Sequence, residues 1–379
     1  MAESIVSVDV RTVTLPLPAP VRNGTKTIVG REYAFVRIET ISGAVGVSCA
    51  FTRGTPLRQV VRDHLGAQLI GRSPFEIEQI WTDLFRSGET FFGRSGVFPR
   101  AVSLIDIALW DLHGKLVGRS VADLLGSVRT TTPIMMALGY YRQDHELEHL
   151  REEYSSLVGL GFRRFKMMAG GASLDHDLQR VAEISSVLSP DATLAIDVNG
   201  AWSSASEALA FLDRIDRQIA FIEDPFLPDN EVALRELRRS SNVPVAIGEW
   251  ESGRSRFAYL IERELVDILR IDATAAGGIS EWLRIADIAK EHGTRILPHY
   301  FPELHVHLAM ATPEVEAIEV VPRLTSADNF DELAVRRPWD EAPVTSVADR
   351  PGFGIEWNAE LVSRLSGGGW DAGSRDAVK

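Results

Sequence analysis

The chain has 379 residues, of which 45% are hydrophobic and 25% charged, so it can bury a large core and most simply forms two domains. Its net charge of −13 disfavours binding to nucleic acid or to an anionic membrane, because both need a basic face that neutralises phosphate. A single cysteine, Cys49, excludes an intrachain disulfide framework and a cysteine-based zinc cluster. The sequence shows neither a long apolar run nor a basic leader at its start, so we expect a cytoplasmic protein.

The first third of the chain has the pattern of an α+β domain, which we place at residues 1–128. Residues 5–49 alternate between apolar and polar in short stretches, as a small antiparallel meander does. Helical periodicity then follows over 57–69, 75–86 and 101–117. No clear catalytic motif lies in this part of the sequence.

From about residue 131, short apolar runs alternate with helical stretches at intervals near 25 residues. The candidate strands are residues 134–138, 164–168, 193–197, 219–223, 245–249, 268–272, 295–299 and 317–321. No glycine-rich dinucleotide fingerprint follows the first strand, so the pattern favours a (β/α)8 barrel over a doubly wound sheet. We place this barrel at residues 129–322 and expect its chemistry at the carboxyl ends of the strands.

Three acidic residues close consecutive candidate strands at equal intervals. Asp197, Glu223 and Glu249 are each 26 residues from the next, which is about one strand, one helix and two loops. Three carboxylates at equivalent strand ends would repel one another unless a cation lay between them. Hard oxygen ligands without nearby cysteine favour Mg²⁺ as that cation.

The remaining strands also end in polar residues. A solvated strand end or a helix cap could explain any one of them, but not the whole set. The further residues at these ends are Lys166, Asn199, Asp224, Asp272, His299 and Glu319.

Five segments of the barrel resemble signatures of the enolase superfamily, in particular its mandelate racemase subgroup. These are Asp197-Val-Asn-Gly-Ala-Trp, Phe221-Ile-Glu-Asp-Pro-Phe, Ile247-Gly-Glu, Arg270-Ile-Asp followed by Gly277-Gly, and Leu297-Pro-His. The helical segment 103–115 and the late Gly354-Ile-Glu-Trp are similar to that family as well, so the likeness covers nearly the whole chain.

The resemblance implies a modified TIM barrel with an N-terminal α+β capping domain. It also implies a homo-oligomer. Residues 323–379 are expected to pack back toward the capping domain and to end in a flexible tail.

The resemblance also assigns roles to the strand-end residues. It implies that Asp197, Glu223 and Glu249 bind one Mg²⁺, and that His299 paired with Asp272 is a general base. A carboxylate beside a histidine orients the ring and raises its basicity. Glu319 is similar to the family's acid that hydrogen-bonds the substrate carboxylate.

The second candidate strand departs from the subgroup pattern. The subgroup commonly has Lys-x-Lys there, and here Lys166 takes the first position and Met168 the second. Strand alternation points Arg164, Lys166 and Met168 inward, so methionine should replace the usual second base, although a register using Arg164 and Lys166 stays open. Methionine cannot accept a proton. A racemase needs a base on each face of its substrate, so the change favours a dehydratase, in which Lys166 could remain as a cation beside the substrate.

Loops of the capping domain set substrate specificity in this family, and residues 21–27 and 51–55 are the candidates here. They contain Arg22, Asn23, Lys26 and Arg53, of which arginine best suits bidentate binding of a distal carboxylate. Tyr140 and Tyr141 end the first barrel strand, where each could reach the site or else pack in the core or face solvent. We select Asn23, Arg53, Tyr141 and Asn199 as substrate-binding candidates.

His305 and His307 form a second His-x-His pattern. They lie in an expected helix, where residues two apart do not face each other, so the pattern is poor evidence for a metal site.

The leading hypothesis is a Mg²⁺-dependent dehydratase of an aldonic or aldaric acid. His299 with Asp272 would remove the α-proton of a small hydroxy-carboxylate substrate, and the enediolate would lose its β-hydroxyl to give a 2-keto-3-deoxy acid. One alternative is a racemase or epimerase with a second base elsewhere. The other is a non-catalytic homologue in which Met168 marks an altered site, although the complete carboxylate set argues against it.

Overall fold

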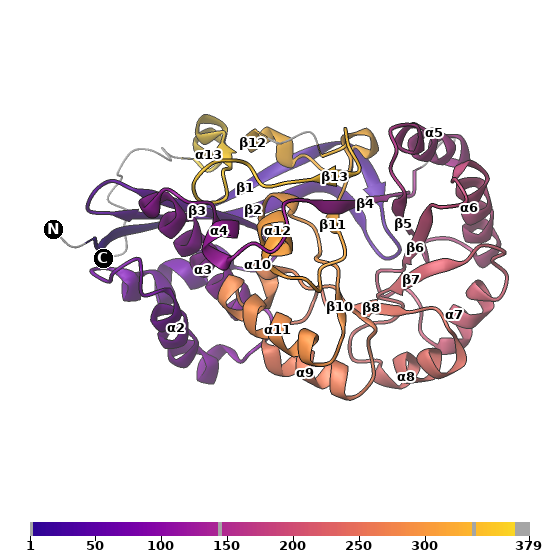
Figure 1. Cartoon of the computed structure of the whole chain (residues 1–379), viewed down its shortest axis with the longest axis horizontal. Helices are drawn as coiled ribbons and strands as arrows, with labels where there is room; N and C mark the ends of the chain where they lie inside the picture. Colours follow the sequence, from indigo (N-terminus) through magenta and orange to yellow (C-terminus); the bar gives the residue numbers. More distant parts are fainter. Residues whose placement is uncertain (1–2, 143–145, 336–338, 368–379) are drawn as a thin grey trace.

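The structure is a computed structural model that describes residues 3–142, 146–335 and 339–367 (Figure 1). Its two main parts are an N-terminal α+β domain and a parallel barrel wrapped in helices. In the described residues, no helix is both long enough and apolar enough to cross a membrane.

The N-terminal domain is built on a three-stranded antiparallel sheet in the order β1-β2-β3. Its strands are β1 (Ile5–Arg22), β2 (Thr27–Thr40) and β3 (Val45–Phe51). The helical segments that follow are α1 (Leu57–Val60), η1 (Val61–Leu65), η2 (Gly66–Leu69), α2 (Ile77–Phe92), α3 (Val97–Val117) and α4 (Val121–Leu125). Alternate residues of the sheet, such as Val36 and Ile38, pack with α3 residues such as Ile105 in a separate core. The predicted strands-then-helices order is therefore confirmed.

The second part is the predicted barrel. Its strands are β4 (Thr132–Leu138), β5 (Arg164–Met168), β6 (Thr193–Asp197), β7 (Ile219–Glu223), β8 (Val245–Ile247), β9 (Ile268–Leu269), β10 (Arg295–Ile296) and β11 (Ile318–Val320). Neighbours in this series pair in parallel from β4 to β10, and β11 pairs with β4. A parallel bridge between Ile296 and Val315 joins the last open edge, so the ring closes.

Helices cover the outside of the barrel (Figure 1). They are α5 (Glu146–Gly159), α6 (Leu174–Val187), α7 (Ala205–Leu212), α8 (Glu231–Ser240), α9 (Arg254–Glu262), α11 (Ile279–Glu291) and α12 (Pro302–Ala311). The short helix α10 (Ala273–Ala276) packs instead against α3 of the N-terminal domain. Several begin with a side chain that accepts a backbone N–H, as Ser173 does for α6 and Asn230 for α8.

Strands β5, β6 and β7 have the predicted bounds, whereas β8, β9 and β10 end two or three residues earlier than predicted. Beyond β10 the ladder continues as isolated backbone bonds, such as the one from His299 N to the Ile271 carbonyl at 3.0 Å. The polar residues at these positions therefore lie on short irregular segments directly above the strands.

A layer of small and apolar side chains fills the barrel beneath those segments. Nearly every strand contributes one member: Met135, Ala195, Phe221, Ala246, Ile268, Leu297 and Ala317. The polar strand-end residues lie above this layer, at the carboxyl ends of the strands.

The C-terminal segment contacts both parts of the molecule. It contains η3 (Arg323–Thr325), η4 (Phe330–Glu332), β12 (Ala334–Val335), β13 (Val344–Thr345), β14 (Glu356–Trp357) and α13 (Ala359–Leu365). Strand β13 pairs with β4, while Asn329 donates to the carbonyls of Leu15 and Pro16 in β1 at 3.1 and 3.0 Å. In Figure 1 this yellow segment lies over β1 and β2. Most of the tail for which we expected flexibility lies outside the described residues.

Candidate active site

A cavity of about 410 Å³ lies between the carboxyl ends of the barrel strands and the N-terminal domain. The barrel lines it with Lys166, Met168, Asp197, Asn199, Glu249, His299 and Glu319. The N-terminal domain lines it with residues of β2 and of the two predicted loops, including Asn23, Lys26, Arg31 and Arg53. The structure thus brings most of the predicted site residues to one place.

Five non-glycine residues around this cavity have positive φ angles: Arg53, Asn199, Asp224, Tyr300 and Phe301. Such backbone conformations cost free energy and persist only where the surrounding structure holds them. They occur in the loops that present the predicted site residues, so local backbone strain is concentrated there.

Lys166 lies buried at the centre of a cluster of carboxylates. Its Nζ is 3.1 Å from Asp197 Oδ2, 2.9 Å from Glu223 Oε1 and 2.6 Å from Glu319 Oε2. Burial alone would lower the pKa of Lys166, but these carboxylates raise it well above its usual value. These contacts favour the charged form of Lys166 in this structure.

Arg270 is a second buried cation, and sequence reasoning did not select it. Its guanidinium contacts Glu223 Oε2 at 2.9 Å, bonds to Glu319, and donates to the carbonyls of Leu297 and Pro298 at 2.8 and 2.9 Å. The available signal was its position two residues before Asp272, which places both on the inward face of β9 and its extension.

Glu319 is held between these cations. Burial would raise its pKa, but Arg270 and Lys166 lower it below the usual range. Its Oε1 accepts a hydrogen bond from the Tyr300 N–H at 3.2 Å. Glu319 is therefore held by Arg270, Lys166 and the Tyr300 N–H in this structure, and its role as the acid that hydrogen-bonds the substrate carboxylate stays a prediction.

Even with these cations, the site has an excess of buried carboxyl groups. Its carboxyl groups are Asp197, Glu223, Asp224, Glu249, Asp272 and Glu319. Burial, with the neighbouring carboxylates, raises the pKa of Asp197 to about 7 and that of Asp224 well above its usual value. The charged forms are thus unfavourable unless a further cation is present.

The carboxylate oxygens fit a hard divalent cation such as Mg²⁺. One ligand atom from each of Glu223, Asp224 and Glu249 lies within 4.8 Å of the others. This group contains Asp224 where we predicted Asp197. Asp197 Oδ2 contacts Lys166 at 3.1 Å, and its Oδ1 accepts from Asn199 Nδ2 at 2.5 Å. Glu223 Oε2 is buried and is paired with Arg270 Nε at 2.9 Å. The acidic cluster is compatible with a magnesium site, with Asp224 as an additional candidate ligand.

His299 and Asp272 form the predicted pair. His299 Nδ1 is 3.1 Å from Asp272 Oδ2, and its Nε2 is 3.0 Å from Glu249 Oε2. Asp272 Oδ1 accepts from the N–H and Oγ1 of Thr274 at 2.8 and 2.7 Å. Burial would raise the pKa of Asp272, but the bonds from His299 and Thr274 lower it, so the carboxylate is ionised. It can orient His299 with Nε2 facing the cavity.

Met168 also lines the cavity, while Arg164 lies exposed at the other end of β5. The side-chain amide of Asn199 lies 3.6 Å from the Met168 sulfur. The structure therefore places Lys166 and Met168 at the cavity. Lys166 takes the first position of the Lys-x-Lys pattern and Met168 the second.

Residues from the N-terminal domain close the opposite side of the cavity. Asn23 Nδ2 donates to Asn199 Oδ1 at 2.6 Å, and Arg53 is 3.2 Å from Glu249 Oε1. Arg31, which sequence reasoning missed, donates twice to the Ala327 carbonyl. Three cations from this domain, Arg31, Arg53 and Lys26, thus line the cavity.

The structure does not bring Tyr141 to the cavity. The Tyr141 hydroxyl donates to Asp177 at 2.5 Å, and its ring lies under the Arg180 guanidinium. Tyr140 lines the cavity instead. Gly139, with φ of 71°, follows the last residue of β4 and breaks the strand alternation, which explains the change of face.

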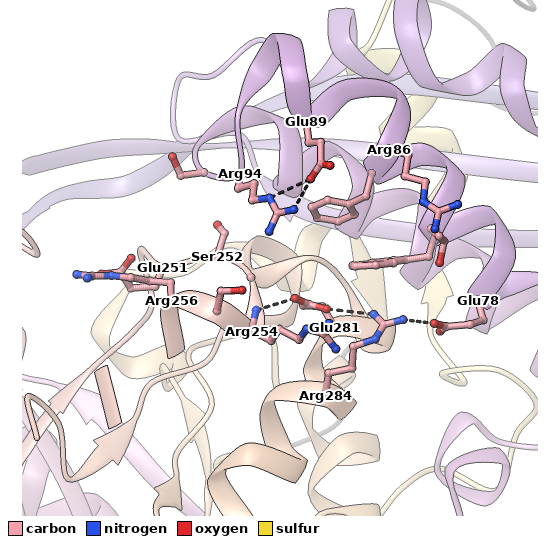
Figure 2. Close-up of a pocket in the computed structure, with 16 residues that line it drawn as sticks. Glu78, Arg86, Glu89, Arg94, Glu251, Ser252, Arg254, Arg256, Glu281 and Arg284 are labelled. Atoms are coloured by element: carbon pink, nitrogen blue, oxygen red, sulfur yellow. Dashed lines mark hydrogen bonds and ion pairs between the residues drawn. The ribbon is translucent and has the colours of Figure 1, made fainter. Parts of the chain in front are cut away.

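A larger cleft of about 860 Å³ lies between α2 and the starts of α9 and α11 (Figure 2). Its charged groups are mostly paired with one another: Arg94 with Glu89, Arg256 with Glu251, and Arg284 with both Glu78 and Glu281. Glu281 also accepts the first N–H of α9, from Arg254, at 2.6 Å. The cleft lacks the buried charge excess of the smaller cavity, so the smaller cavity is the candidate active site.

Comparison with known proteins identifies the family of this chain. Residues 5–126 match the mandelate racemase/muconate lactonizing enzyme N-terminal domain, and residues 149–361 match the enolase C-terminal domain-like family. The chain belongs to the enolase superfamily. It is an enzyme of this superfamily and contains both the N-terminal and the barrel domain.

Relatives with curated names act on sugar acids and their lactones. Arabinonate dehydratase of Saccharolobus solfataricus is 29% identical over 85% of this chain and 87% of its own length. D-galactarolactone cycloisomerase of Agrobacterium fabrum is 30% identical over 92% of this chain and 95% of its own length.

Solved structures share the same fold over almost the whole chain. L-talarate dehydratase from Polaromonas sp. JS666, complexed with Mg and L-glucarate, has a TM-score of 0.84 and 26% identity, covering 95% of this chain and 96% of its own. A racemase from Streptomyces coelicolor with bound magnesium has a TM-score of 0.86 and 25% identity, covering 96% of this chain and 99% of its own.

Proposed function

We propose that this enolase-superfamily protein is a Mg²⁺-dependent dehydratase of a sugar acid. The proposal depends on the asymmetry of the cavity: His299 is paired with Asp272, whereas Met168 takes the place of the second lysine of the Lys-x-Lys pattern on β5. Elimination of water can use one histidine, first as base and then as acid, whereas racemisation by two bases cannot use a methionine.

The chain's own residues account for the proton transfers. Nε2 of His299 would accept the proton from the carbon next to the substrate carboxylate, and the Asp272 carboxylate would stabilise the imidazolium that forms. The same Nε2–H would then donate to the departing β-hydroxyl, which leaves as water. The ammonium group of Lys166 would lie beside the negative charge that develops on the substrate.

Asp197, Glu223 and Glu249 are the residues that would hold Mg²⁺, with Asp224 beside them. Bound Mg²⁺ would supply the positive charge that makes the α-proton of a carboxylate removable. Glu249 Oε2 lies 3.0 Å from His299 Nε2, so a residue that would hold the metal is next to the proposed base.

The proposal has two enzymatic competitors with distinct products. A racemase or epimerase would need a second base that the cavity does not supply at Met168. A cycloisomerase, like the relative from Agrobacterium fabrum, would act on a lactone. A panel of aldonic acids, aldaric acids and their lactones, followed by assay of keto acid and by NMR in ²H₂O, separates these reactions.

The direct test is replacement of His299 by Asn. We expect turnover to fall by roughly 10²–10⁴-fold, the usual contribution of a general base, while Mg²⁺ still binds. Metal binding is measured by calorimetry, and turnover by keto-acid formation. Normal turnover by His299→Asn would exclude the proposed mechanism, and deuterium exchange with inversion but no keto acid would select the racemase.

A further inference from the structure

The His-x-His pattern in α12 has a structural role that sequence reasoning did not anticipate. His305 and His307 are both buried, and each ring connects two backbone groups. Neither imidazole faces the carboxylate cluster as a ligand. The two histidines differ in which segments they connect.

His305 connects the two segments that present the catalytic pair. Its Nδ1–H donates to the carbonyl of Tyr300 at 2.6 Å, and its Nε2 accepts from the N–H of Ala273 at 3.2 Å. Tyr300 directly follows His299, and Ala273 directly follows Asp272. One buried ring thus joins the residue after the base to the residue after its carboxylate partner.

The protonation state of His305 agrees with these bonds. With one ring nitrogen donating and the other accepting, the imidazole must be neutral. Burial lowers the pKa of His305 to about 4, so the ring stays neutral at physiological pH. Its ring also contacts Trp282 at a centroid distance of 5.6 Å, which limits its movement.

The Tyr300 segment needs such a restraint. Tyr300 and Phe301 have φ angles of 54° and 41°, which are unfavourable for aromatic residues. The ladder between β9 and β10 has ended at this point, and the bond from His299 N to the Ile271 carbonyl is its last backbone link here. Besides the bonds from Tyr300 to Glu319 and Asp328, the His305 ring is the restraint that ties this segment directly to the residue after Asp272.

We propose that His305 is a positioning residue that sets the separation between His299 and Asp272. It would act through the backbone carbonyl of Tyr300 and the backbone N–H of Ala273, without contact with substrate. The expected effect on turnover rests on the proposed function. The effect on the His299–Asp272 distance does not, and it can be tested separately.

His307 offers a matched control two residues away. Its Nδ1 accepts from the Ala122 N–H at 3.2 Å, and its Nε2–H donates to the Phe353 carbonyl at 3.1 Å. It therefore also connects two backbone segments from a buried position, but it joins α4 to the C-terminal segment. Replacing either ring by Phe leaves one N–H and one carbonyl without this partner.

The experiment compares His305→Phe, His307→Phe and His305→Gln, each with Mg²⁺. Crystal structures give the His299 Nδ1 to Asp272 Oδ2 distance, and thermal unfolding gives stability. Kinetics use whichever acid the substrate panel identifies. Gln can both accept and donate with its amide, so it is the conservative variant.

We expect both Phe variants to lose similar thermal stability, but only His305→Phe to lengthen the 3.1 Å contact of the catalytic pair. Its kcat should fall roughly 10²-fold with KM little changed, because misplacement of about 1 Å has effects of that size. His305→Gln should recover much of kcat, and His307→Phe should keep it when assayed well below its Tm.

An unchanged His299–Asp272 distance in His305→Phe would overturn the inference whatever the reaction proves to be. Equal loss of kcat in His305→Phe and His307→Phe would overturn it too, since that pattern indicates a general loss of stability. If the unmodified protein turned over none of the acids while His305→Phe still separated the pair, the positioning role would stand and the proposed function would fail.

Discussion

Two cavities of this protein contain glutamate and arginine side chains, yet they differ in charge balance. In the larger cleft between α2 and α11, exposed Arg94 pairs with Glu89, and Arg284 pairs with Glu78 and Glu281. In the smaller cavity at the barrel mouth, buried carboxyl groups outnumber Lys166 and Arg270, and the pKa of Asp197 is raised to about 7.

The difference shows why cavity volume alone does not identify a functional site. Paired surface charges contribute little free energy and leave nothing for a ligand to neutralise. Unbalanced buried charges destabilise the fold, so they persist where a ligand such as a metal ion removes the imbalance. The comparison predicts large functional effects for substitutions in the small cavity and small effects in the large cleft.

The largest expected effect comes from Asp197→Asn. Loss of this carboxylate should weaken Mg²⁺ binding and reduce turnover on the order of 10³-fold, since metal charge stabilisation is worth several kcal/mol. Calorimetry with Mg²⁺ and keto-acid assays measure both quantities. Glu281→Gln, which removes a buried carboxylate of the large cleft, is the control and should leave Mg²⁺ affinity unchanged. Tight Mg²⁺ binding by Asp197→Asn would contradict the assignment of Asp197.

The same variant has a stability signature in the presence of a chelator. The folded-state pKa of Asp197, about 7, lies above its ordinary value of 3.8, so ionisation favours the unfolded chain between these pH values. Wild-type stability should therefore fall relative to Asp197→Asn as pH rises from about 4 to 7, and the two should converge below that window. Urea unfolding at several pH values measures the difference, and a constant difference would contradict the charge imbalance.

A smaller effect is expected for cations on the capping side of the cavity. Arg31→Ala and Arg53→Ala should lower kcat/KM for diacids by roughly 10- to 100-fold, the value of one or two charged hydrogen bonds, with monoacids little affected. The assay compares aldaric with aldonic acids. Arg94→Ala, from the large cleft, should change neither. If Arg53→Ala left both substrate classes equally unchanged, its proposed contact with a distal carboxylate would be excluded.

Patterns repeated along the chain made the barrel predictable from sequence. Each repeat alternates an apolar strand with a helix, and the acidic residues recur at 26-residue intervals, so Asp197, Glu223 and Glu249 could be placed at one end of the ring. The alternation of side chains along β5 likewise predicted that Lys166 and Met168 lie on one face, and both line the cavity in the structure.

Residues outside regular strands were less predictable. We selected Tyr141, which would face the cavity if the alternation of β4 continued. Gly139, directly after that strand, has a positive φ angle that breaks the alternation, so Tyr140 faces the cavity instead. Arg31 looked like an ordinary residue of an alternating strand, because its proximity to the barrel depends on how the two parts pack together. Such contacts join positions far apart in the sequence, and the local pattern of apolar and polar residues does not indicate them.

The smallest effect is expected for a substitution in the large cleft. Glu78→Gln removes the exposed partner of Arg284, whose guanidinium also bonds to Glu281 at 3.0 Å and stacks on Trp81. Because exposed ion pairs contribute about 0–1 kcal/mol, the free energy of unfolding should change by no more than about 0.5 kcal/mol, measured in urea. Catalysis and Mg²⁺ affinity should stay at wild-type values. A large loss of turnover from Glu78→Gln would show that the large cleft communicates with the barrel mouth, and that balanced surface charge is a poor guide to which cavity is functional.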